Sequence, residues 1–436
     1  MDAALEASTM RKVYLRLLPF ALLSYILAYL DRINVSFGAL TMRGDLGMSA
    51  GDFGFAVGTF YWAYFLFEVP SNVIMEKVGA RIWIARIMIT WGVFACATAW
   101  VTGPVSFGVV RFLLGMAEAG FFPGLILYFT YWFPARHHAR IVSGFLIGLP
   151  VAVAFGAPIS TALMGLHGLF GYKGWQIMYL AEGIPTVLIG IATYFVLTNK
   201  PEQAKFLTQE ERDWLVAKIA SERRAKEAVR IYSMLDSMWN PKVLLLALNY
   251  FGIVTASLGM LIFIPQIIKS LGTMDNMTVG WLTMIPYICG AIALVTWGRS
   301  SDTKNERRWH LLLACVFSTG GLVLAALTMG TWWALVGMSI AAMGFYGSKG
   351  PFFAMPPMFL SGTALAAGIA WINSIGNLGG FFGPWWVGVM KDLTGSYAGG
   401  LYGLALLGLI SSIVCALFLH IPDVISPASR QPAPAE

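Results

Sequence analysis

Long apolar stretches, separated by shorter polar segments, occupy most of the chain. A helix needs roughly 20 apolar residues to cross a hydrocarbon core about 30 Å thick. On that basis the pattern predicts an all-α membrane protein with twelve transmembrane helices. The spans are expected at residues 16–38, 53–75, 82–102, 105–132, 141–165, 175–198, 242–269, 278–298, 309–328, 331–358, 365–390 and 399–420.

The longest polar interruption follows the sixth predicted span and divides the spans into six plus six. Within it, Thr208 and Glu211 form a capping-box pattern, which predicts a solvated helix up to about Lys226. The Pro- and Ala-rich end of the chain is expected to be disordered. The expected parts are an N-terminal six-helix bundle (1–198), a cytoplasmic central loop (199–241), a C-terminal six-helix bundle (242–422) and a disordered tail (423–436).

The composition excludes a water-soluble protein. Of the 436 residues, 58% are hydrophobic and 12% charged, and the mean hydropathy is +0.70. A soluble domain carries about 25% charged residues. The four cysteines lie in apolar stretches without CxxC spacing, so we expect neither disulfides nor a metal site. No clustered catalytic set points to an enzyme, and no cofactor is expected.

Lysine and arginine predict the orientation in the membrane. When both termini are placed on one side, that side holds 22 basic residues and the other side only four. Cytoplasmic loops carry such an excess, so both termini are expected in the cytoplasm. The net charge of +7 then reflects topology, and the expected partner is the lipid bilayer rather than a nucleic acid.

Two loops repeat the same charge spacing at matching places in the two halves. Glu76 and Arg81 follow the second span, and Asp302 and Arg307 follow the eighth, each pair five residues apart. An acid at a helix end can meet cations and helix termini in one conformation and lose them in another. These four residues are therefore predicted to act in gating.

Four longer strings narrow the choice of family. They are YLDRINVSFGAL (29–40), FEVPSNVIMEKVGAR (67–81), RFLLGMAEAGFFPG (111–124) and NSIGNLGGFFGP (373–384). In these strings the chain resembles the anion:cation symporter family of the major facilitator superfamily, which includes bacterial permeases for tartrate, phthalate and sugar acids.

This resemblance implies two pseudo-symmetric six-helix bundles around a central cavity that opens alternately to each side. It also implies a monomer in a bacterial inner membrane, with protons as the coupling ion. In such relatives the acids that match Asp31 and Glu118 are the protonation sites. The arginine that matches Arg32 binds the substrate carboxylate.

Five charged residues lie inside the predicted spans. They are Asp31 and Arg32 in the first, Arg111 and Glu118 in the fourth, and Lys349 in the tenth. A charge near the bilayer centre is costly, so it usually faces a cavity or a partner. Three cations and two acids make a net-positive site, which suits an anion.

Arg111 and Glu118 lie two turns apart on one helix face, too far to pair easily. Each is expected to contact the first span, and an ion pair between Arg111 and Asp31 competes with a substrate-binding role for Arg111. Glu118 lies among small apolar residues, where a low dielectric favours the neutral carboxyl group that proton coupling requires. Glu68 and Glu182, near span ends, are interpreted as structural.

Tyr25, Tyr29 and Arg32 recur at helical spacing and form one stripe of the first span. The planar guanidinium of Arg32 suits a carboxylate because its fork matches two oxygens. Tyr29 is expected to contact substrate with Arg32. Tyr64 either completes this wall or has a packing role.

The C-terminal half contributes a second set of candidates. Lys349 is too deep to reach the membrane surface easily, so we expect it to contact either the substrate or a protein acid such as Asp31 or Glu118. The remaining candidates are Phe352, Phe353, Asn373 and Asn377. For the two asparagines, hydrogen bonding between helices is the alternative.

These residues predict a proton-coupled symporter that imports an organic carboxylate, with export by antiport as the alternative. Two cations from opposite halves suit a dicarboxylate. Residues 147–155, expected to face the cavity, carry no amide or hydroxyl side chain, which favours an aromatic acid such as phthalate. The string similarity is at least as good to tartrate permeases.

Overall fold

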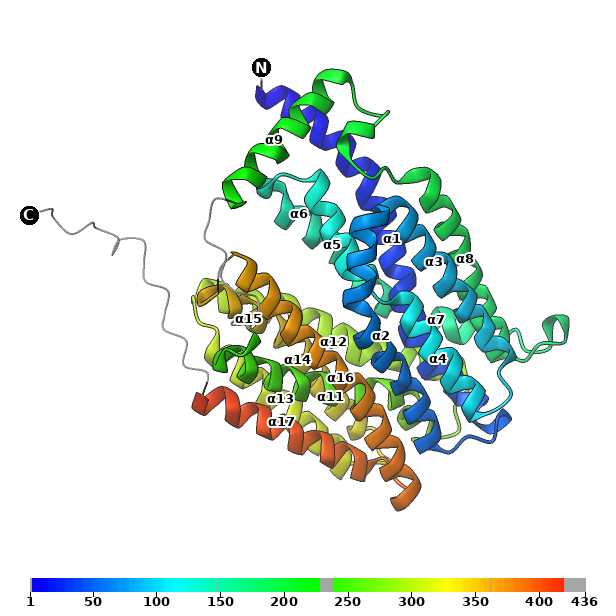
Figure 1. Ribbon diagram of the computed structural model, residues 1–436. Coiled ribbons are helices and arrows are strands. Elements are labelled where there is room, and N and C mark those ends of the chain that lie inside the picture. Colours follow the sequence, from blue (N-terminus) through cyan, green and yellow to red (C-terminus); the bar gives the residue numbers. More distant parts are fainter. Residues whose placement is uncertain (1, 147, 228–237, 361, 419–436) are drawn as a thin grey trace, which may run out of the picture.

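The structure is a computed structural model that describes residues 2–146, 148–227, 238–360 and 362–418. In those ranges every regular element is a helix, and the ribbons form two groups (Figure 1). The N-terminal group contains α1 (Asp2–Asp45), α2 (Ala50–Val78), α3 (Ala80–Ala97), α4 (Pro104–Glu118), α5 (Phe121–Trp132), α6 (Ala135–Leu146), α7 (Gly148–Met164) and α8 (Gly174–Val196). The C-terminal group contains α11 (Pro241–Lys269), α12 (Asn276–Thr303), α13 (Arg308–Leu327), α14 (Trp333–Gly347), α15 (Lys349–Ala354), α16 (Gly362–Thr394) and α17 (Ala398–Phe418). The predicted all-α fold is confirmed.

Eight segments in the described ranges are long and apolar enough to cross a membrane. The other four predicted spans correspond to α2, α16 and the pairs α6–α7 and α14–α15. Large apolar side chains such as Val105, Phe195 and Leu417 remain exposed on the outer surface, as expected where lipid replaces water. The eight segments are Ala4–Asp45, Ala80–Trp100, Pro104–Trp132, Gly174–Val196, Pro241–Lys269, Asn276–Thr303, Arg308–Leu327 and Ala398–Phe418.

The predicted span 105–132 is two helices rather than one. The break is at Gly120, whose φ of +87° lies in the left-handed region. A Cβ atom there would collide with the Ser71 side chain of α2, so glycine allows both the turn and the close approach. The break leaves Glu118 as the last residue of α4.

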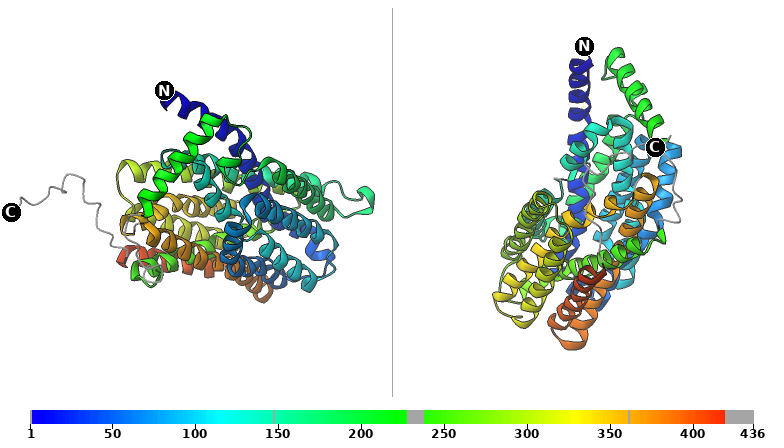
Figure 2. Two further views of the ribbon diagram at one scale, coloured as in Figure 1. Left: turned by 45° about the horizontal axis from the view of Figure 1, so that its top comes forward. Right: turned by 90° about the vertical axis from the view of Figure 1, so that its left-hand side faces the viewer.

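Hydrogen bonds join the two groups at one end of the molecule, which we call the far end because it lies opposite α9 (Gln209–Glu227). There Arg43 donates to Gln266 at 2.6 Å, and Asp392 accepts from the backbone N–H groups of Ala50 and Gly51 at 3.0 and 2.6 Å. No hydrogen bond between the groups lies toward α9 within the described residues. In that direction the two sets of ribbons diverge (Figures 1 and 2).

The predicted solvated helix of the central loop is α9, which leans against the start of α1 (Figure 2). Glu211 accepts from Ser8 at 2.8 Å and lies 2.8 Å from Lys12 Nζ, while its capping-box bond with Thr208 is also present. Burial raises the pKa of Glu211, but the bonds from Lys12, Thr208 and Ser8 outweigh it and hold the pKa at about 2. The N-terminal extension of α1 thus anchors the loop helix.

Candidate functional site

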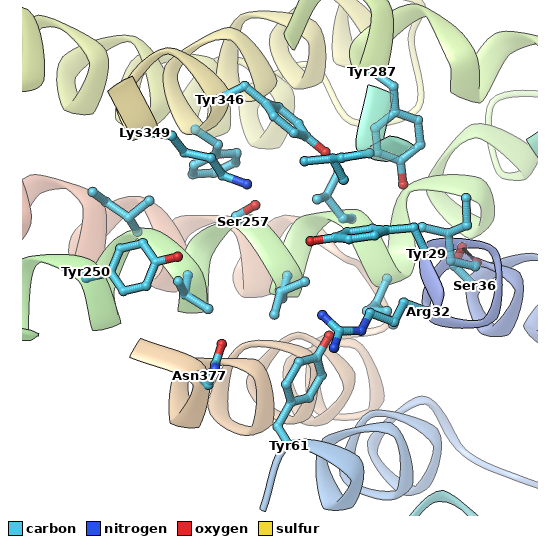
Figure 3. A pocket seen from close by; sticks show the side chains of 18 residues that line it. Tyr29, Arg32, Ser36, Tyr61, Tyr250, Ser257, Tyr287, Tyr346, Lys349 and Asn377 are labelled. Carbon is cyan, nitrogen blue, oxygen red and sulfur yellow. Dashed lines mark hydrogen bonds between the residues drawn. The ribbon is translucent and has the colours of Figure 1, made fainter. Parts of the chain in front are cut away.

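A cavity with an empty volume of about 930 Å³ lies between the two groups (Figure 3). Helices α1, α2 and α7 form one wall, and α11, α12, α14, α15 and α16 form the other. The polar and aromatic residues labelled on its lining are Tyr29, Arg32, Ser36, Tyr61, Tyr250, Ser257, Tyr287, Tyr346, Lys349 and Asn377.

Arg32 lies on the α1 wall and is bound to a carboxylate of the protein itself. Its Nε donates to Glu118 Oε1 at 2.8 Å, and its Nη2 lies 2.5 Å from the same oxygen. The Glu118 side chain is 1% exposed and that of Arg32 is 25% exposed. Glu118 therefore holds the guanidinium from behind the wall, and the expected contact between Glu118 and the first span is present.

Aromatic rings surround the same guanidinium. Arg32 Cζ lies 5.4 Å from the centre of the Tyr29 ring and 5.2 Å from that of Tyr64. Such contacts favour a cation that has left bulk water. Tyr29 lines the cavity, whereas Tyr64 supports Arg32 and is not among the lining residues.

Asp31 points away from the cavity, toward α3 and α8. Its Oδ2 accepts from the indole N–H of Trp91 at 2.6 Å, and its Oδ1 accepts from Asn34 at 3.2 Å. Asn34 also donates to Glu182 at 2.7 Å. The described structure thus brings together Asp31 and Glu182, and within it Asp31 forms no hydrogen bond or ion pair with Arg32 or Glu118.

Of the two alternatives for Arg111, the ion pair with Asp31 is not formed in the described chain. N–H donors on Trp91 and Asn34 occupy the Asp31 oxygens instead. Arg111 is buried, lies 5.0 Å above the Phe60 ring, and its Nε has no hydrogen-bond partner. It is not a lining residue of the cavity.

Lys349 lies on the opposite wall from Arg32 (Figure 3). Its Nζ is 4.9 Å from the centre of the Tyr346 ring. Among the described residues it forms no ion pair, because Asp31 and Glu118 have other partners. The geometry therefore does not support the alternative in which Lys349 neutralises one of these two acids.

The remaining C-terminal candidates divide into lining and supporting residues. Asn377 lines the cavity, but Asn373 on the same helix does not. The Phe352 ring stacks on Tyr250 at 4.9 Å and the Phe353 ring meets it edge-on at 5.4 Å. The two phenylalanines thus position Tyr250, which lines the cavity in their place.

Several lining residues are missed by the sequence patterns. Ser36 continues the stripe of Tyr29 and Arg32 by one further turn, so helical spacing could have found it. The other missed polar residues are Tyr61, Tyr250, Ser257, Tyr287 and Tyr346, and no motif marks them. Of residues 147–155, which were expected to face the cavity, Leu149 lines it, whereas Phe155, 59% exposed, does not. Residue 147 lies outside the described residues.

The two predicted gating loops hold their arginines differently. Arg307 pairs with Asp302 of its own loop at 2.5 Å and donates to Ser301 at 2.9 Å. Arg81 instead donates to the carbonyl oxygen of Tyr194 and lies above that ring, while Glu76 is exposed and forms no ion pair within the described chain. A gating role for these four residues stays a prediction.

Comparison with known proteins places this architecture among transporters. The sequence profile of the Major Facilitator Superfamily matches residues 21–384. A bacterial homologue of the human lysosomal transporter Spinster, solved in an inward-facing and occupied conformation, superposes with a TM-score of 0.77 at 16% identity. That superposition covers 94% of this chain and 98% of the other, and it supports the fold.

Curated relatives are closer in sequence. A protein described as a putative tartrate transporter of Agrobacterium vitis is 49% identical over 410 residues, which cover 94% of this chain and 91% of that protein. A quinolone resistance transporter of Acinetobacter baumannii is 37% identical over 409 residues, with 94% of each chain covered. Both similarities extend over nearly the whole length.

Proposed function

Since the chain belongs to the Major Facilitator Superfamily, we propose that it imports an organic carboxylate together with protons across a bacterial inner membrane. The observation that carries this proposal is the bond between Arg32 and Glu118 at the cavity wall. A guanidinium that already binds a carboxylate of the protein has the geometry to bind a carboxylate of a substrate. The 49% identity to a protein described as a tartrate transporter supports an organic acid as substrate.

The same bond supplies a way to couple protons to transport. A proton on Glu118 removes the charge that holds Arg32, so the guanidinium becomes available to a substrate carboxylate. Return of the proton to solvent restores the Arg32–Glu118 pair and displaces the substrate. Proton and substrate then bind together and leave together, which is symport.

Lys349 supports a dicarboxylate in particular. Arg32 and Lys349 stand on opposite walls of one cavity, and one belongs to each group of helices. A ligand with a carboxylate at each end would join the two groups and favour closure around itself. The surrounding hydroxyl groups of Tyr287, Tyr346 and Ser257 suit a hydroxylated dicarboxylate such as tartrate better than an aromatic one.

The proposal includes an orientation and a division of the chain. The distribution of the basic residues favours cytoplasmic termini. The protein acts as a monomer, in which the bundles 1–198 and 242–422 move relative to each other about the cavity. With that orientation, the far-end hydrogen bonds close the side away from the cytoplasm. The charged loops at 76–81 and 302–307 then lie at the cytoplasmic ends of their helices.

Reconstitution in proteoliposomes tests the function directly. Tartrate should accumulate inside when the outside is made acidic, and an inverted gradient should drive it out. Purified protein should also gain thermal stability with tartrate, because a ligand that binds the native state stabilises it. Absence of both effects across a panel of mono- and dicarboxylates would reject an organic-acid symporter.

Export by antiport is the second candidate, because the quinolone resistance transporter is 37% identical over almost the whole chain. A proton antiporter responds to the same gradient in the opposite sense. Accumulation of a substrate inside vesicles whose interior is more acidic than the outside would therefore favour antiport, and hence export.

A further inference from the structure

A second set of buried polar side chains lies beside the cavity and has no part in the scheme above. Asp31 on α1 and Glu182 on α8 are 3% and 5% exposed. Asn34 lies between them and donates from one nitrogen, Nδ2, to Asp31 Oδ1 at 3.2 Å and to Glu182 Oε2 at 2.7 Å. One amide group thus links two carboxyl groups from different helices.

The outer oxygens of this set are also hydrogen bonded. Trp91 of α3 donates to Asp31 Oδ2 at 2.6 Å, and Ser160 of α7 donates to Glu182 Oε1 at 2.7 Å. Each carboxyl oxygen therefore accepts one bond, but Asn34 Oδ1 is buried without a partner. A buried acceptor normally finds a donor. A proton on either carboxyl group is a donor of the kind that is missing.

The charges around the set also favour one bound proton. Neither carboxyl group has a cation within ion-pair distance among the described residues. Two ionised carboxylates that share one amide in a low dielectric repel each other, and a single proton removes that repulsion. The titratable and charged groups that face them from the packed helices are Glu118 and Arg111 of α4, Cys96 of α3 and Tyr179 of α8.

We propose that Glu182 carries a coupled proton, which it shares with Asp31 through Asn34, in addition to the proton carried by Glu118. This inference rests on the proposed symport. Near the middle of α8, Glu182 is well placed to exchange a proton with α1, and the interpretation of this residue as purely structural is replaced. Asp31 directly precedes Arg32, so its charge acts on the residue that binds substrate.

The number of coupled protons can be measured in proteoliposomes with tartrate as the probe. At zero membrane potential, set by valinomycin and equal potassium, each coupled proton multiplies the limiting accumulation about tenfold per pH unit, since one unit is worth about 1.4 kcal/mol. With one pH unit imposed, Glu182→Gln should therefore accumulate about tenfold less tartrate than wild type. Exchange at equal concentrations should persist, because it needs no net proton movement.

Glu68→Gln is the matched control. Glu68 is a buried acid on α2 outside this set, so the variant should keep the wild-type accumulation ratio. An unchanged ratio in Glu182→Gln would overturn the inference while leaving symport intact. Wild-type protein that exchanges tartrate but never accumulates it would overturn the proposed coupling first, and this inference with it.

Ser160→Ala keeps the test decisive should Glu182→Gln fail to fold. It removes the donor to Glu182 Oε1 without removing a titratable group. Loss of that donor favours the protonated carboxyl group, so the midpoint of the pH profile of exchange should move to higher pH. A midpoint equal to that of wild type would overturn the role of Glu182.

Discussion

The two walls of the cavity differ in the kind of polar chemistry that stands behind them. In the N-terminal group four acids are buried, namely Asp31, Glu68, Glu118 and Glu182. In the described C-terminal group, the acids lie at helix ends or in loops, and the charged lining residue is Lys349. Among the described residues of the two groups, buried carboxyl groups are thus confined to the N-terminal one.

This difference separates two tasks that a coupled transporter must combine. The N-terminal wall offers a cation whose availability depends on a neighbouring carboxyl group. The C-terminal wall offers hydroxyl groups and the cation of Lys349, which no described acid neutralises. These groups can bind the end of a ligand that Arg32 does not hold. We infer that the N-terminal half governs coupling and the C-terminal half governs selectivity, and the predictions below test that division.

The largest effect is expected at Arg32, because this residue both binds the substrate carboxylate and pairs with Glu118. Arg32→Lys replaces a planar fork by a point charge, and a charge-assisted pair is worth about 1.5–3 kcal/mol, so affinity for every carboxylate should fall roughly 10- to 150-fold. Uptake should be largely lost at normal expression. Arg86→Lys, which alters a guanidinium held above Trp83 away from the cavity, is the control. Wild-type uptake in Arg32→Lys would remove Arg32 from the site.

Glu118→Gln should break coupling and spare recognition. The amide cannot carry the charge that holds Arg32, so gradient-driven accumulation should fall by at least the factor of about ten per pH unit that one coupled proton supplies, while exchange at equal concentrations continues. Radiolabelled uptake with and without a pH gradient measures both quantities in one preparation. Full gradient-driven accumulation in this variant would make Glu118 structural and contradict the division between the walls.

Lys349→Met tests the C-terminal wall. It should weaken a dicarboxylate by about 1.5–3 kcal/mol and leave its monocarboxylate analogue nearly unchanged, since only the dicarboxylate reaches both cations. Isothermal titration of both ligands measures the difference, and Lys391→Met at the far end serves as control. Equal losses for the two ligands would return Lys349 to a structural role.

The sequence predicts well those features that repeat along the chain or that carry a high energetic cost in a membrane. Apolar length marks the spans, and the price of a charge in lipid marks Arg32, Glu118 and Lys349 as notable. The break at Gly120 was not predicted, because an apolar run continues through it. The partner of Asp31 was also missed, because an indole N–H carries no charge and no spacing links Trp91 to α1.

The sequence also does not show which aromatic residues line the cavity. Tyr250 and Phe352 are both aromatic residues within apolar spans, and only packing decides that the first lines the cavity and the second supports it. A stripe on one helix, such as Tyr29, Arg32 and Ser36, is visible in sequence. The C-terminal wall, which is assembled from five helices, is not.

The smallest effect is expected at Glu211, which lies outside both walls. The pKa of Glu211 is about 2 in the folded protein, below the ordinary value of 4.5, so its stabilising contribution is present above pH 4.5 and is lost as the pH falls toward 2. Glu211→Gln should loosen α9 from α1 by about 1 kcal/mol, because the partner Lys12 is partly exposed. Hydrogen exchange should show lower protection in α9 and unchanged protection in α8, and Glu210→Gln, at an exposed neighbour, should change neither. Because α9 contacts α1 only near its start, away from the residues of α1 that line the cavity, tartrate affinity and accumulation should match wild type. A change in either would mean that the central loop acts on the cavity, and the division of tasks between its walls would then be incomplete.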